Sequence, residues 1–107
     1  MLAACHPTSR DVKQVAQDAL ENARIQLDSG NKVEAMRLFK EAEHYGIMAN
    51  QTLMVAHARY HIAQCLGYYA DKEEVVSLLK AAAEGFGEDY ADRAEALWEL
   101  GDFDQYH

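Results

Sequence analysis

NKVEAMRLFKEA, at residues 31–42, and DKEEVVSLLKAA, at residues 71–82, are two copies of one pattern. A shift of 40 residues aligns them, and five of the twelve positions are then identical. Chance would give about one identity at ordinary residue frequencies. The identical pairs are Lys32/Lys72, Glu34/Glu74, Leu38/Leu78, Lys40/Lys80 and Ala42/Ala82. The chain therefore contains an internal repeat. Since both copies share one pattern, we expect them to fold alike, so the structure of one repeat unit decides the fold.

Helical periodicity extends to both sides of each copy. Apolar residues recur at steps of three and four, which places them on one face of a helix. No segment alternates as a β-strand would, and Pro7 is the sole proline. We therefore predict an all-α protein of about five antiparallel helices, joined in pairs by short turns. The expected helices span residues 10–29, 32–46, 51–69, 72–85 and 90–100.

The apolar stripes predict the core. The residues expected to be buried are Val12, Val15, Ala16, Ala19, Leu20, Ala23, Leu27, Met36, Phe39, Ala42, Tyr45, Val55, Ile62, Ala63, Leu66, Tyr69, Val75, Val76, Leu79, Ala82, Ala83, Tyr90, Ala94, Leu97 and Trp98.

Cap residues predict where the helices begin and end. Asn31 is followed three residues later by Glu34, as a capping box requires, and Gly30 suits the left-handed position that closes a helix. Asn50 is the expected cap of the third helix, and Gly46 the expected end of the second. The fourth helix has Asp71 as its expected cap, with Gly85 and Gly87 at its end.

Each repeat unit resembles a tetratricopeptide repeat. That family has a small residue late in its first helix and a small, a bulky and another small residue on its second. The matching residues here are Ala23, Ala35, Phe39 and Ala42 in the first unit, and Ala63, Val75, Leu79 and Ala82 in the second. The repeat is 40 residues long, against about 34 in the family. The resemblance implies a right-handed superhelix of two α-hairpins, with residues 90–100 as a capping helix.

The same resemblance implies a binding groove. In tetratricopeptide proteins the first helix of each pair lines a concave surface that binds another protein or a peptide. The corresponding residues here are Gln17, Leu20, Arg24, Leu27, His57, Tyr60, Gln64 and Tyr68. We expect Tyr60 and Tyr68 to be the anchors and Arg24 the charged contact, because aromatic and arginine side chains dominate binding energy at interfaces. A homodimer that enlarges this small surface is an alternative.

Residues 2–5, Leu-Ala-Ala-Cys, resemble the lipobox at which bacterial lipoprotein signal peptides are cut. The resemblance implies lipid attachment at Cys5 and a location on the periplasmic face of a bacterial envelope. No apolar signal segment precedes it, which fits if Met1 is not the true start. We assign residues 1–9 to a tether, 10–101 to the helical domain and 102–107 to a tail. A cytosolic adaptor without lipid is the alternative.

Charge and composition exclude other classes of function. The net charge is −8, and residues 71–107 contain eleven acidic and three basic side chains. Nucleic-acid binding needs the opposite sign, so we do not expect it. No apolar run reaches 18 residues, so the expected membrane contact is through lipid only.

Candidate chemistry is sparse in this sequence. No nucleophile–base motif, phosphate-binding loop or carboxylate pair stands out, so we expect neither an enzyme nor a cofactor. His57, His61 and Cys65 follow one another at steps of four and share a helix face. A weak metal site at these residues is one alternative, and a Cys5–Cys65 disulfide is another.

Overall fold

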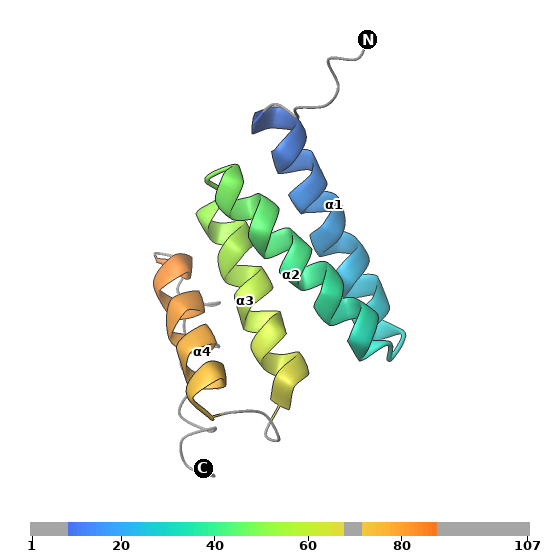
Figure 1. The fold of residues 1–107 in the computed structure, drawn as a ribbon, viewed down its shortest axis with the longest axis vertical. Coiled ribbons are helices and arrows are strands. Elements are labelled where there is room, and N and C mark those ends of the chain that lie inside the picture. Colours follow the sequence, from blue (N-terminus) through green and yellow to red (C-terminus); the bar gives the residue numbers. More distant parts are fainter. Residues whose placement is uncertain (1–8, 68–71, 88–107) are drawn as a thin grey trace.

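A computed structural model describes residues 9–67 and 72–87. These residues contain four helices, α1 (Ser9–Asp28), α2 (Lys32–Met48), α3 (Thr52–Leu66) and α4 (Lys72–Phe86), and no strand. Successive helices lie side by side and run antiparallel (Figure 1). The all-α prediction is therefore confirmed. The fifth expected helix, over residues 90–100, lies outside the described residues.

The turn between α1 and α2 is closed by backbone hydrogen bonds. Gly30 has a φ of +85°, and its N–H donates to the carbonyl of Leu27 at 3.0 Å. The N–H of Asn31 donates to the carbonyl of Gln26 at 2.9 Å, which completes a Schellman motif. The Asn31 side chain accepts a hydrogen bond from the N–H of Glu34. The cap is thus confirmed, but the return bond of a capping box is absent, because the Asn31 N–H already has its partner in α1.

The turn between α2 and α3 has the same geometry, which corrects the prediction for Asn50. Asn50 has a φ of +56° and donates its N–H to the carbonyl of Ile47, while Gln51 donates to Gly46. Asn50 therefore closes α2 as Gly30 closes α1, and does not cap α3. Gln51 is the N-cap residue of α3, and its side chain makes no capping bond.

Two glycines expected to end helices lie inside them instead. A Cβ on Gly46 would come 2.8 Å from Cγ2 of Val55, and one on Gly85 would come 2.8 Å from Cβ of Ala56. Both glycines therefore let a neighbouring helix approach α3 closely. Conversely, α3 ends at Leu66, earlier than expected, because the next residue, Gly67, has a φ of +66°.

Two clusters of buried apolar side chains form the core. One joins α1, α2 and α3 around Phe39, which is fully buried. The other joins α3 and α4 and includes Tyr60 and Phe86. Leu66 and Leu78 pack against both clusters. Equivalent repeat positions are buried alike: Ala23 and Ala63, Ala35 and Val75, Phe39 and Leu79, and Ala42 and Ala82. The two repeat units therefore use the same positions for packing.

The predicted core needs correction in several places. Val15 is 40% exposed, because it lies at the edge of the stripe on α1. On α3 the prediction was too narrow: Ala56, Ala58 and Tyr60 are also buried. The reason is that α3 lies between α2 and α4, so it has more than one buried face (Figure 1).

Candidate functional site

A groove runs between α1 and α3 and consists of two adjoining hollows. The aromatic hollow, of about 360 Å³, is lined by Arg24, Leu27, Asp28, His57, Tyr60, His61 and Phe86. The amphipathic hollow, of about 490 Å³, is lined by Lys13, Gln17, Leu20, Glu21, Arg24, Gln51, Leu53, Met54 and His57. Arg24 and His57 line both hollows, so the two adjoin at these residues. Side chains one turn apart share a face of a helix, so the lining residues on α1 recur at steps of three and four.

The structure brings six of the eight expected groove residues together. These are Gln17, Leu20, Arg24, Leu27, His57 and Tyr60. Gln64 is exposed and lines neither hollow; its side-chain oxygen lies 2.8 Å from Nδ1 of His61. Tyr68 lies outside the described residues.

The lining residues lie at different depths. Leu20 and Tyr60 are 8% and 6% exposed and form the floor, whereas Gln17 and Arg24 are exposed at the rim. Tyr60 therefore does not project as the anchor that we expected. Its ring belongs to the core of the second unit, 6.3 Å from the ring of Phe86.

Phe86 is a lining residue that the sequence analysis missed. It follows Val75, Leu79 and Ala82 at helical steps of three and four, so extending the stripe past Gly85 would have found it. Leu53 and Met54 were also missed. They belong to the first turn of α3, where the expected stripe began only at Val55.

The two histidine rings that line the aromatic hollow pack against phenylalanine rings of the neighbouring helices. The ring of His57 lies edge-on to Phe86 at 5.0 Å, and the ring of His61 stacks on Phe39 at 4.9 Å. His61 also lies 5.5 Å from the ring of Tyr60. Both histidines thus contribute to packing between helices, because aromatic faces and edges attract one another at these separations.

The alternative metal site does not assemble in the described part of the chain. No three His, Cys, Asp or Glu side chains within residues 9–67 and 72–87 are grouped so as to hold a metal ion. Cys65 is half-buried, and this burial raises the pKa of its thiol, while nearby Lys32 opposes the shift. Burial disfavours the thiolate, which is the form that binds metals and attacks electrophiles.

Charges of both signs surround the groove. Lys13 and Arg24 face it from α1, and so do Glu21 and Asp28. The floor between them is apolar. This combination of an apolar floor and a polar rim is the usual anatomy of a protein interface.

Comparisons of the chain with family profiles, with curated proteins and with solved structures found no match. Among the described helices, none has the length and apolar character needed to cross a membrane. The fold and the groove together define the class: an all-α protein of antiparallel helix pairs, with a groove between the first helices of the two pairs.

Proposed function

We propose that this chain is a scaffold that binds a segment of another protein in the groove between α1 and α3. The observation that supports this proposal is that six expected groove residues line two adjoining hollows. The floor supplies apolar contact, and exposed Arg24 and Gln17 supply hydrogen bonds at the rim. A groove of this size suits an extended peptide or one face of a helix.

We further propose that the two helix pairs form a tetratricopeptide-like superhelix. Small side chains at matching positions support it: Ala23 and Ala63, and likewise Ala42 and Ala82, are at most 3% exposed. Small residues allow close helix contact, which gives stacked α-hairpins their curvature.

Binding fits the groove better than catalysis does. The residues lining the two hollows include no Ser, Thr or Cys, so a hydroxyl or thiol nucleophile paired with a histidine is not found among them. Both histidines are engaged in ring contacts between helices. Nucleophilic catalysis by a hydroxyl or thiol needs such a group within hydrogen-bond reach of a base.

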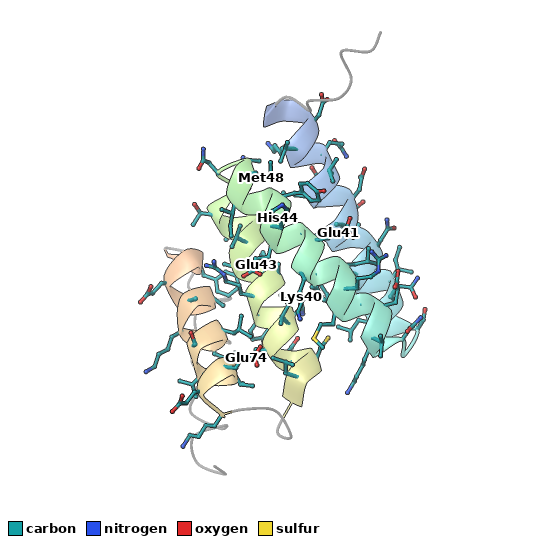
Figure 2. The ribbon with its side chains drawn as sticks, viewed as in Figure 1. Lys40, Glu41, Glu43, His44, Met48 and Glu74 are labelled. Atoms are coloured by element: carbon teal, nitrogen blue, oxygen red, sulfur yellow. The ribbon has the colours of Figure 1, made fainter. Side chains whose placement is uncertain are left out.

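Site-specific photo-crosslinking tests the proposed groove. A photoreactive residue would replace Gln17 in the amphipathic hollow, with Lys40 on α2 as the control position. Lys40, which is labelled in Figure 2, is exposed and is not among the residues that line either hollow. We expect a defined protein adduct in the source cells from Gln17 only, and its loss when Arg24→Glu is added. Equal adducts from both positions would show that the groove is not the binding surface.

We propose in addition that Cys5 carries the lipid that tethers this scaffold to a bacterial envelope. Support comes from the Leu-Ala-Ala-Cys sequence, which lies outside the described residues. Expression of the complete gene with labelled palmitate should give a labelled protein, and Cys5→Ser should remove the label while Cys65→Ser retains it. Absence of label in the wild type would leave the cytosolic adaptor as the better proposal.

A further inference from the structure

The side of the groove that α1 forms carries its charges in a regular order. Five exposed polar side chains make up this α1 rim: Lys13, Gln17, Glu21, Arg24 and Asp28. At about 100° per residue they fall within an arc of about 80°, so they form one narrow stripe along the helix. The charges alternate along the stripe in the order positive, negative, positive and negative. The rim therefore has no net charge, but it has a specific charge pattern.

The four charges of the α1 rim have no partners within residues 9–67 and 72–87. No ion pair or side-chain hydrogen bond engages them there. By contrast, exposed Arg37 on α2 pairs with both Glu34 and Glu41. Since α1 lies at one end of the row of helices (Figure 1) and its rim is exposed, these charges are open to pairing with another molecule.

A second copy of the α1 rim complements the first when the two helices run antiparallel. With a two-fold axis at the middle of the rim, Lys13 lies level with Asp28 of the second copy. Glu21 lies one helix turn from Arg24 of the second copy, within reach of these long side chains. Each charge thus meets an opposite charge. In a parallel pair every charge would lie level with its own copy, and like charges repel.

The hollow beside the α1 rim adds apolar contact to the same interface. Leu20 and Met54 line the amphipathic hollow, and Leu53, which also lines it, is 46% exposed. When the two rims meet, the two amphipathic hollows face each other, because one axis relates both features. Removal of these apolar side chains from water then favours association in addition to the charge pairs.

We propose that two copies of this chain associate through the α1 rim and the amphipathic hollow, with their α1 helices antiparallel. Exposed charge pairs are individually weak, so the association is reversible. The second copy occupies the face that the proposed function gives to a segment of another protein, and the two compete for it. Self-association needs the purified chain alone, so this inference does not rest on the proposed function.

An exchange of charges tests the pairing. Sedimentation equilibrium of the full chain with Cys5→Ser, under reducing conditions, gives the dissociation constant of the dimer. Lys13→Glu and Asp28→Lys each place like charges opposite one another, so each should raise this constant about tenfold or more. The double variant exchanges the two signs and should restore the original value. Asp28→Lys reduces the net negative charge of the chain, so general repulsion between copies would not explain a weaker dimer.

Lys40→Glu is the matched control for Lys13→Glu, because it makes the same change in net charge. Lys40 is exposed and lines neither hollow, so this variant should change the dissociation constant far less. Circular dichroism would verify that each variant is folded.

Disulfide formation tests the direction of the helices. In the chain with Cys5→Ser and Cys65→Ala, Glu21→Cys would bring two thiols together at the axis. Lys13→Cys would hold them about 22 Å apart along the helices, at about 1.5 Å per residue. Mild oxidation should therefore cross-link the first variant and not the second. Cross-linking of the second variant, or of neither, would contradict the antiparallel dimer.

A chain that stays monomeric, single reversals without effect, or a double variant that fails to restore the dimer would each overturn the inference. A monomer that still forms an adduct with another protein from Gln17 would leave the groove to that protein, which contradicts the inference and supports the proposed function. A dimer that forms no adduct with another protein would do the reverse.

Discussion

Arg24 and Tyr60 line the same groove in different physical situations. Arg24 is exposed at the rim and belongs to neither buried cluster. Tyr60 is 6% exposed, and its ring is part of the cluster that joins α3 to α4. A change at Arg24 therefore alters what the groove binds, whereas truncation at Tyr60 alters the fold itself.

At this scale we predict that Tyr60→Ala lowers the free energy of unfolding by about 3 to 5 kcal/mol, the usual cost of removing a buried aromatic side chain. Arg24→Ala should change it by less than about 0.5 kcal/mol, as surface substitutions do. Urea unfolding followed by circular dichroism measures both. A small loss for Tyr60→Ala would contradict its place in the core and restore it as an exposed anchor.

At the scale of the element, the helices end by one repeated device. Gly30 follows α1 and Asn50 follows α2, and both residues have a positive φ. In each turn, this residue and the next one donate their N–H groups to carbonyls near the end of the preceding helix. Asparagine adopts this conformation more easily than other residues with a Cβ, but less easily than glycine. The turn between α2 and α3 therefore uses asparagine, a residue type that is also favoured as the N-cap of the next helix.

The observed role of Asn50 and the role expected from the sequence predict opposite effects for one substitution. As the residue that closes α2, Asn50→Gly should raise the free energy of unfolding by roughly 0.5 to 1 kcal/mol, because glycine has no Cβ to strain. As a cap of α3, the same change would lower it by a few tenths. Asn31→Ala is the comparison, with an expected loss of about 1 kcal/mol. Thermal and urea unfolding decide the sign.

At the scale of the whole molecule, the two repeat units are joined through α3. Its apolar faces contact both clusters, and Arg59 on α3 also forms an ion pair with Glu43 on α2 at 2.8 Å. These side chains are 31% and 26% exposed. Glu43 is labelled on α2 in Figure 2. Partial burial reduces screening by solvent, so this pair contributes more to the joint between units than a fully exposed pair would.

We predict a measurable coupling between these two residues. A double-mutant cycle with Arg59→Met and Glu43→Gln should give about 0.5 to 1 kcal/mol in the free energy of unfolding. The exposed pair of Arg37 and Glu41, both on α2, is the control and should give less. Coupling that is equal in the two cycles would mean that the pair between α2 and α3 adds nothing specific to the joint.

The sequence by itself determined the approximate positions of the four described helices and the internal repeat, whereas the six groove residues that it named came from the resemblance to tetratricopeptide repeats. These features follow from local periodicity, since a stripe of apolar residues requires a helix with one buried face. The tertiary structure alone decided that α3 is buried on two sides, which makes Tyr60 a core residue. It also decided that Asn50 closes α2, and that Gly46 and Gly85 lie within helices at close contacts. The physical reason is that burial and close packing depend on neighbours distant along the chain, which periodicity within one helix does not specify.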